Sequence, residues 1–263
     1  MTVMELPEVT EDIAPAVADF IRKSAASAGC SGAVIGLSGG LDSAVAAKLT
    51  ADALGYDNVL CVFMPYGKAS VKDRDVCSDM CGLWGIELKV IDITSSVDTF
   101  LSSVSGDQTP VDIGNAAARC RMAILYNIAR RNGRIVVGTS NLSERMMGYF
   151  TKYGDGACDI SPLAGLYKTQ VRQLASFIGV PCDIISKPPS AGFWEGQTDE
   201  EEMGISYTDL DKVLCGIDSG MDDGTIAYCT GVSGDKVAEI RNTVDRTSHK
   251  RSMPDEMTFD TVF

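Results

Sequence analysis

The sequence lacks the features that would place it in several large functional classes. It has no signal peptide and no run of about 18 apolar residues, so we expect a protein that neither enters nor crosses a membrane. Its 23 lysines and arginines are outnumbered by 36 aspartates and glutamates, which gives a formal charge of −13. Because nucleic-acid phosphates require clustered cations, this balance argues against a nucleic-acid partner and favours a small substrate.

The usual spacings of metal-binding cysteines and histidines are missing too. The nine cysteines are an odd number without a CxxC pair, and His249 is the one histidine. Cys77 and Cys81 could share a helix face, but His249 lies far away in sequence, so we interpret them as buried core thiols rather than zinc ligands. Reduced thiols predict a cytoplasmic protein.

The most informative stretch is AVIGLSGGLDSAVAAK, which starts at Ala33. Its pattern predicts a buried strand over 33–37, a tight turn at 38–40 and a helix over 41–54. Glycines at a helix N-terminus let backbone N–H groups approach an anion, and Ser38 and Ser43 add hydroxyl donors. A phosphate is the expected ligand, although a plain strand-to-helix connection can also contain glycines.

No lysine follows these glycines, so the loop is not a Walker A motif, and Asp42 stands in that place. A carboxylate would repel phosphate unless a cation lay between them, so Asp42 predicts Mg²⁺ that bridges a carboxylate and a polyphosphate. The string SGGLDS resembles the pyrophosphate-binding loop of the ATP pyrophosphatase superfamily. The resemblance implies cleavage of ATP to AMP and pyrophosphate with adenylation of a substrate.

The chain as a whole alternates between predicted strands and helices. Apolar strands are expected at 33–37, 59–64, 88–91 and 134–138, and helices at 13–28, 41–54, 73–84, 115–131 and 167–178. This alternation predicts an α/β fold, a doubly wound parallel sheet with helices on both faces. We find no linker, so residues 1–263 are expected to form a single domain with an N-terminal helix.

Ligands of such sheets bind beyond the carboxyl ends of the strands, and polar residues gather there. The fourth strand runs into Thr139-Ser140-Asn141, and Glu144 follows one helical turn later. The segment GYFTKYGDGACD, at 148–159, has no regular period and contains Lys152, Asp155 and Asp159. Such a concentration of charge is hard to justify as packing, although a compact surface turn is an alternative.

Two of the predicted helices, 115–131 and 167–178, carry cationic side chains in positions that packing alone does not explain. Arg119 and Arg121 are two residues apart, so they cannot both face the core, and at least one faces solvent or a ligand. Lys168 lies in the first turn of the helix expected at 167–178, where a cation opposes the helix dipole by roughly a few tenths of a kcal/mol. An anionic ligand would remove this cost; an exposed lysine is the plain alternative.

Residues 186–206 are predicted to form a long irregular loop. The pair Phe193-Trp194 favours a lid, and the acidic run Asp199–Glu202 is interpreted as a solvated face. Residues 208–247 are expected to form two or three short helices without recognisable chemistry.

Several ordered strings together are similar to the NAD synthetase family and span nearly the whole chain. They are GLSGGLDS, PYG at 65–67, the segment 115–122, VGTSNLSE at 137–144, GYFTKYGDG at 148–156, PLAGLYKTQVRQLA at 162–175, KPPSAGFWEGQTDE at 187–200 and HKR at 249–251. The chain resembles the ammonia-dependent form, because only about 30 residues precede the loop and no glutamine amidase domain is expected.

The resemblance implies that the carboxylate of deamido-NAD attacks the α-phosphate of ATP, and that ammonia then displaces AMP to give NAD. It also implies an adenine nucleotide alpha hydrolase-like fold, Mg²⁺ as cofactor and a homodimer. By position, Asp42 and Glu144 would ligate Mg²⁺, and Asp155 would deprotonate ammonium. The implied ATP-binding residues are Gly36, Leu37, Ser38, Gly39, Gly40, Leu41, Asp42, Ser43, Thr139, Lys168 and Ser190. The implied deamido-NAD-binding residues are Arg119, Lys152, Asp159, His249 and Lys250.

Two positions depart from the family pattern. Leu41 stands where many members have Gln, and Lys72 follows Ser70 where a second serine often helps to hold phosphate. Two rival functions share the loop: another adenylating amidotransferase or thiolase of the superfamily, and a non-catalytic ATP-binding module. A module that only binds ATP has no need for the pair Asp42 and Glu144.

Overall fold

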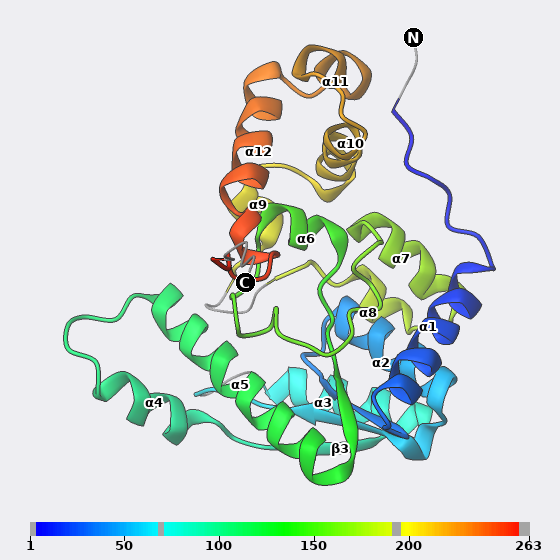
Figure 1. Cartoon of the computed structure of the whole chain (residues 1–263), viewed down its shortest axis with the longest axis vertical. Helices are drawn as coiled ribbons and strands as arrows, with labels where there is room; N and C mark the ends of the chain where they lie inside the picture. The colour runs from blue at the N-terminus through cyan, green and yellow to red at the C-terminus, as the bar shows by residue number, and fades with distance from the viewer. Residues whose placement is uncertain (1–3, 68–70, 191–195, 258–263) are drawn as a thin grey trace, which may run out of the picture.

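Four parallel strands form the centre of the fold (Figure 1). The computed structural model describes residues 4–67, 71–190 and 196–257. The strands are β1 (Gly32–Gly36), β2 (Val59–Phe63), β3 (Glu87–Val90) and β4 (Arg134–Val137), and their order in the sheet is β3-β2-β1-β4. The predicted parallel sheet is confirmed, and each predicted strand lies within one residue of its observed bounds.

The connections between strands are helical. The helices are α1 (Ile13–Ser27), α2 (Leu41–Leu54), α3 (Val71–Trp84), α4 (Thr94–Ser102), α5 (Pro110–Asn132), α6 (Leu142–Met147), α7 (Lys168–Phe177), α8 (Cys182–Ser186), α9 (Asp199–Met203), α10 (Tyr207–Asp218), α11 (Asp223–Thr230) and α12 (Gly234–Arg246), with 3₁₀ turns η1 (Tyr56–Asn58) and η2 (Ser248–Lys250). None of the helices in the described ranges is long and apolar enough to cross a bilayer.

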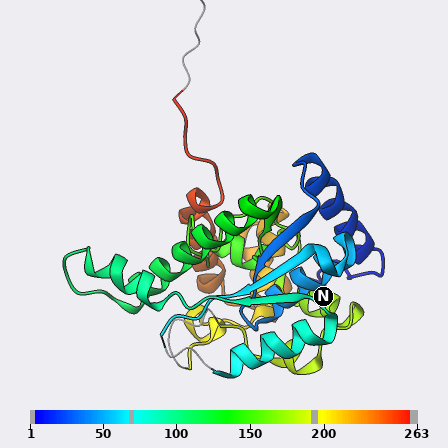
Figure 2. The same ribbon diagram turned by 90° about the horizontal axis from the view of Figure 1, so that it is seen from below.

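Successive residues of the strands point into two separate cores. Ile35, Cys61 and Val137 pack with α1, α2, α3 and α7 on one face, whereas Val34 and Val62 pack with α4 and α5 on the other. Both faces are therefore covered by helices, as Figure 2 shows in a view turned by 90°. Cys77 and Cys81 belong to the first core, as predicted, because the apolar faces of α3 and the sheet meet there.

β2 and β3 lie on one side of β1, and β4 lies on its other side, so the direction of the strand order reverses between β1 and β4. This reversal determines where a ligand site is expected. The loops after these two strands open side by side at the carboxyl edge of the sheet, which is where doubly wound sheets bind ligands. A third apolar cluster joins α6, α10, α11 and α12, and these helices stand above that edge in Figure 1. The segment before α1 runs alongside them, and the Met4 N–H donates to the Cys229 carbonyl.

Three elements differ from the prediction for identifiable reasons. β3 lies at the edge of the sheet and carries exposed Glu87 and Lys89, so it is not apolar throughout. α5 begins at Pro110 rather than near residue 115, because Thr109 and Asp112 form a capping box there. The expected loop at 186–206 contains the short helix α9. The lid pair Phe193-Trp194 lies outside the described residues.

Candidate active site

The loop between β1 and α2 is held in shape by its two serines. Ser43 Oγ accepts from the Ser38 N–H at 3.2 Å and donates to the Gly40 carbonyl at 3.0 Å, and Ser38 Oγ accepts from the Gly40 N–H at 3.2 Å. Gly39 has φ +75°, and a Cβ there would lie 3.4 Å from the Asp73 carbonyl. The left-handed backbone conformation therefore favours glycine here, whereas the space around it would admit a Cβ. The free N–H groups at the start of α2 face the same opening.

The loop after β4 reaches back to this first loop. Asn141 caps α6, because its side chain accepts from the Glu144 N–H while the Glu144 carboxylate accepts from the Asn141 N–H. The Asn141 amide also donates to Asp42 Oδ1 at 3.0 Å. The loops that follow β1 and β4 are therefore joined by a direct hydrogen bond, and Asn141 fixes the orientation of Asp42. Sequence reasoning placed Asn141 at this edge but gave it no role.

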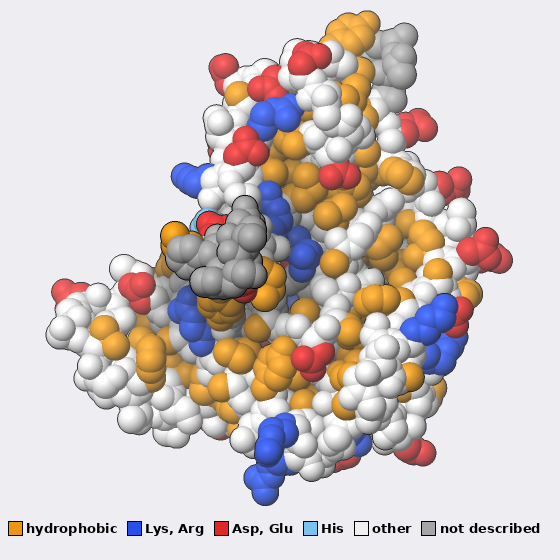
Figure 3. Space-filling model, in the orientation of Figure 1, with side chains coloured by type: hydrophobic (Ala, Val, Ile, Leu, Met, Phe, Trp, Pro, Cys, Tyr) orange, Lys and Arg blue, Asp and Glu red, His pale blue; other side chains and the backbone are white. Residues whose placement is uncertain are grey.

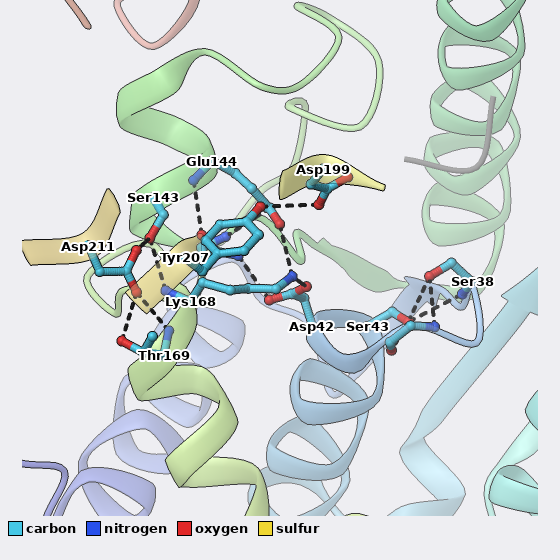
Figure 4. Close-up of polar contacts among 12 residues, drawn as sticks. Ser38, Asp42, Ser43, Ser143, Glu144, Lys168, Thr169, Asp199, Tyr207 and Asp211 are labelled. Atoms are coloured by element: carbon cyan, nitrogen blue, oxygen red, sulfur yellow. Dashed lines mark hydrogen bonds and ion pairs between the residues drawn. The ribbon is translucent and has the colours of Figure 1, made fainter. Parts of the chain in front are cut away.

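The Lys168 ammonium lies between two carboxylates (Figure 4). It forms a short ion pair with Asp42 Oδ2 and a second one with Glu144 Oε1 at 3.2 Å. The Lys168 side chain is 4% exposed, and those of Asp42 and Glu144 are each 16% exposed. Three residues that are distant in sequence thus form one charged cluster at the helix N-termini of α2, α6 and α7.

The two carboxylates of this cluster share one ammonium, and these charges shift the pKa values of Glu144 and Lys168. Burial and the neighbouring charge of Asp42 raise the pKa of the Glu144 carboxyl to about 8, although Lys168 opposes the shift. Burial disfavours the charged form of Lys168, but the charges of Asp42 and Glu144 outweigh it and raise the pKa of the lysine. One ammonium between two ionised carboxylates would leave an excess negative charge, so a divalent cation bound beside them would favour the ionised form of Glu144.

A second group of predicted residues meets around the segment 148–159. The Arg119 guanidinium donates to the Lys152 carbonyl at 3.4 Å, and Lys152 Nζ donates to the His249 carbonyl at 2.6 Å. Lys250 Nζ donates to the carbonyls of Gly148 and Phe150 at 2.6 and 2.8 Å. Residues from α5, this segment and η2 therefore form one cationic surface.

The remaining predicted residues have separate positions. Arg121 is half-buried and donates to the Met64 carbonyl, whereas Arg119 is exposed, as the spacing required. The Asp155 carboxylate accepts from the Thr151 N–H at 2.9 Å. The Asp159 carboxylate accepts from the Val136 N–H of β4 at 2.7 Å and makes no hydrogen bond to the four residues of the cationic surface. Thr139 lies two residues after the end of β4, in the loop that leads to α6, and Ser190 lies in the segment that follows α8.

The interpretation of the acidic run 199–202 as a solvated face is wrong for Asp199. This residue is 3% exposed and accepts from the Tyr207 hydroxyl at 3.1 Å, and its negative charge lies near Lys168. The Glu202 carboxylate accepts from the Tyr149 hydroxyl at 2.7 Å. Since all four residues are acidic, local sequence gave no sign of which one turns inward; the neighbouring Tyr207 and Lys168 decide it.

Lys187 is a further residue at the loop that sequence reasoning did not single out. Its ammonium donates to the Gly39 carbonyl at 3.1 Å and to Asp73 Oδ1 at 2.9 Å. A cation therefore lies at the mouth of the anion-binding loop. The Lys-Pro-Pro sequence that begins with Lys187 was the available signal, because the following proline restricts the backbone of this lysine to an extended conformation.

Known proteins share both the sequence and this architecture. The sequence pattern of the NAD synthase family matches residues 13–254. A protein of Methanosarcina mazei, named NH3-dependent NAD+ synthetase, is 42% identical over 241 residues, which cover 90% of this chain and 94% of that protein.

Two solved structures are also similar. The NMN synthetase of Francisella tularensis has a TM-score of 0.84 at 37% identity, with 95% of this chain and 98% of that chain covered. The NH3-dependent NAD synthetase of Campylobacter jejuni, in complex with the nitrate ion, has a TM-score of 0.81 at 31% identity, with 94% and 98% covered.

Proposed function

The chain belongs to the NAD synthase family, and from this premise we propose how its residues convert deamido-NAD, ATP and ammonia to NAD, AMP and pyrophosphate. The observation that carries the proposal is the convergence of Asp42, Glu144 and Lys168 beside the loop Gly36–Ser43. An anion-binding loop next to two carboxylates and a lysine suits the transfer of an adenylyl group from a polyphosphate. A carboxylate is a poor electrophile, so adenylation prepares it for ammonia.

We propose Mg²⁺ as the cofactor, held by Asp42 and Glu144. Among the described residues no group of three or more His, Cys, Asp or Glu could hold a metal alone. Mg²⁺ at a polyphosphate characteristically uses one or two carboxylates together with phosphate oxygens and water, so the pair fits this ion. When bound, Mg²⁺ would offset the charge that develops on the leaving pyrophosphate. Lys168 would then turn its ammonium toward the phosphate oxygens.

The other ATP contacts follow from the same geometry. The backbone N–H groups of the loop and the hydroxyls of Ser38 and Ser43 would bind the phosphates, and Thr139 and Ser190 would contact the rest of ATP. Lys187 is added to this set because it already lies against the Gly39 carbonyl. A substitution Lys187→Gln should raise the KM for ATP several-fold without a change in the KM for deamido-NAD.

The cationic surface formed by Arg119, Lys152, His249 and Lys250 is proposed to bind deamido-NAD. Its cations suit the pyrophosphate and carboxylate of that dinucleotide. Asp159 is hydrogen-bonded to the backbone of β4 instead, so it would contact a different portion of the ligand. Asp155 is proposed to accept a proton from ammonium. Its carboxylate is oriented by the Thr151 N–H and lies near the Lys250 charge.

Purified protein incubated with ATP, Mg²⁺, deamido-NAD and an ammonium salt tests the function. We expect NAD, AMP and pyrophosphate in equal amounts, and none of them with Asp42→Asn. Release of ADP and phosphate, or formation of pyrophosphate without deamido-NAD, would contradict the proposal.

The similarity to an NMN synthetase supports a second acceptor, the nicotinate mononucleotide. Both acceptors present the same carboxylate, so the adenylation cluster does not distinguish them. The value of kcat/KM for each acceptor decides the matter. We expect deamido-NAD to be preferred, because the cationic surface offers several contacts to a second phosphate, and a higher value for the mononucleotide would reverse the assignment.

We further propose that residues 1–263 act as one synthetase domain, that the protein is cytoplasmic and that it forms a homodimer. The nine cysteines are unpaired among the described residues, as a reducing compartment would allow. α4 and the first half of α5 project from the body as an arm (Figures 1 and 2). Exposed Phe100, Val104 and Val111 lie on this arm, and hydrophobic side chains emerge on its visible face in Figure 3. A second copy of the chain would cover them.

A further inference from the structure

A buried carboxylate lies directly behind the Asp42–Glu144–Lys168 cluster without touching any of its side chains. It belongs to Asp211 of α10, which is 0% exposed. Its Oδ1 accepts from Ser143 Oγ at 2.5 Å, and its Oδ2 accepts from the Thr169 N–H at 2.8 Å and from Thr169 Oγ1 at 2.7 Å (Figure 4). Ser143 precedes Glu144 in the sequence, and Thr169 follows Lys168. Asp211 therefore forms hydrogen bonds to the neighbours of both residues, on the side away from their carboxylate and ammonium.

Ser143 extends this connection to Lys168 itself. Ser143 Oγ accepts from the Lys168 N–H at 2.9 Å. The N–H groups of Lys168 and Thr169 lie in the first turn of α7, where no carbonyl of the same helix can accept from them. Asp211 and Ser143 supply these missing acceptors, and the carboxylate complements the positive end of the helix dipole. The backbone from which the Lys168 side chain extends is therefore held by α6 and α10.

The same helix also contacts the far end of the Lys168 side chain. Tyr207 precedes Asp211 by four residues, so both face one side of α10. The Lys168 ammonium lies 5.4 Å from the centre of the Tyr207 ring, and the Tyr207 hydroxyl donates to Asp199. α10 thus restrains the Lys168 backbone indirectly, through the bonds of Asp211 to Ser143 and Thr169, and it contacts the Lys168 ammonium through Tyr207.

We propose that Asp211 is a positioning residue for adenylation, which fixes Glu144 and Lys168 relative to each other through Ser143 and Thr169. This inference rests on the proposed function. The separation between the Glu144 carboxylate and the Lys168 ammonium determines whether Asp42 and Glu144 can hold Mg²⁺ while Lys168 reaches a phosphate. Displacements on the order of 1 Å in such groups lower rates by about a hundred-fold.

The substitution Asp211→Asn tests this role with little change in side-chain volume. The amide nitrogen of asparagine cannot accept a hydrogen bond, so at least one donor among Ser143 and Thr169 loses its partner. We expect kcat to fall about ten- to a hundred-fold and the Mg²⁺ concentration for half-maximal activity to rise. The KM for deamido-NAD should stay unchanged, because Arg119, Lys152 and Lys250 make no hydrogen bond to α10. Calorimetric titration with Mg·ATP should show an affinity about ten-fold weaker.

Asp209→Asn is the matched control. Asp209 carries the same charge on the same helix, but it accepts from Ser206 and does not contact α6 or α7 by a hydrogen bond. Its kinetic constants should equal those of the wild type. Ser143→Ala provides a second test that keeps the Asp211 carboxylate and its Thr169 bonds, and it should shift the Mg²⁺ dependence in the same direction by a smaller factor.

The outcomes separate the two proposals. The inference is wrong if Asp211→Asn and Ser143→Ala retain the Mg²⁺ dependence and Mg·ATP affinity of Asp209→Asn. It is equally wrong if the lost kcat only mirrors a lost fraction of folded protein, measured by urea unfolding. If the wild type itself forms no NAD, the proposed function fails, and the Mg·ATP titration still decides whether Asp211 positions the cluster.

Discussion

At the scale of single residues, Lys168 contributes both to the stability of the fold and to the proposed reaction. Its ammonium compensates the negative charges of the Asp42 and Glu144 carboxylates. Removal of one partner of a buried ion pair leaves an uncompensated charge, so Lys168→Ala should lower the free energy of unfolding by about 3–5 kcal/mol. Urea unfolding measures this loss. Arg22→Ala, which removes an exposed ion pair with Asp19, serves as the control and should leave stability nearly unchanged. Equal effects of the two substitutions would contradict the assigned burial.

Glu144 gives a pH-dependent prediction. Its pKa in the folded protein is raised from 4.5 to about 8, so the unfolded chain ionises first as pH rises. The wild type without ligands therefore loses stability from this group between its unfolded pKa and about 8. Glu144→Gln cannot ionise, so its stability relative to the wild type should increase through this window and stay constant above it. Urea unfolding at a series of pH values measures both stabilities. If the pKa of Glu144 were not raised in the folded protein, the stabilities of the wild type and of Glu144→Gln would change in parallel with pH.

At the scale of elements, the local sequence pattern was sufficient to predict the strands and the phosphate-binding loop. It was not sufficient to predict that Asp199 and Asp211 are buried behind the charged cluster. Ala33–Leu37 and Arg134–Gly138 are apolar on every residue that the sheet buries, and Gly39 has little alternative to a turn. Asp211 and Asp199 carry no such sign, because an aspartate on an amphipathic helix or in an acidic run is normally solvated. Their burial is decided by α6, α7 and Lys168, which are distant in sequence.

Gly39 tests the loop as an element. Gly39→Ala introduces a Cβ at φ +75°, which strains the backbone of the phosphate-binding loop by about 1–2 kcal/mol. We expect the KM for ATP to rise at least ten-fold. Gly29→Ala at φ +68° has open space around its Cβ and carries the same strain outside the site, so it should lose stability without a change in KM. Unchanged ATP binding in Gly39→Ala would argue against the loop as the phosphate site.

At the scale of the whole molecule, the projecting α4–α5 arm is the feature that a single chain leaves unexplained. Phe100→Glu combined with Val104→Glu should convert the proposed homodimer to a monomer, because each adds a charge to an apolar contact. Sedimentation velocity measures the result. Tyr228→Glu on α11 is equally exposed but lies far from the arm and should leave the dimer intact. A wild-type monomer would refute this part of the account.

The cluster of Asp42, Glu144 and Lys168 is proposed to transfer an adenylyl group to the carboxylate of deamido-NAD. Deamido-NAD with ¹⁸O in both carboxylate positions follows this transfer directly. If that carboxylate attacks the α-phosphate and ammonia then displaces AMP, mass spectrometry will find one ¹⁸O in AMP and one in the amide of NAD. AMP without ¹⁸O, or label in pyrophosphate or phosphate, would contradict the account.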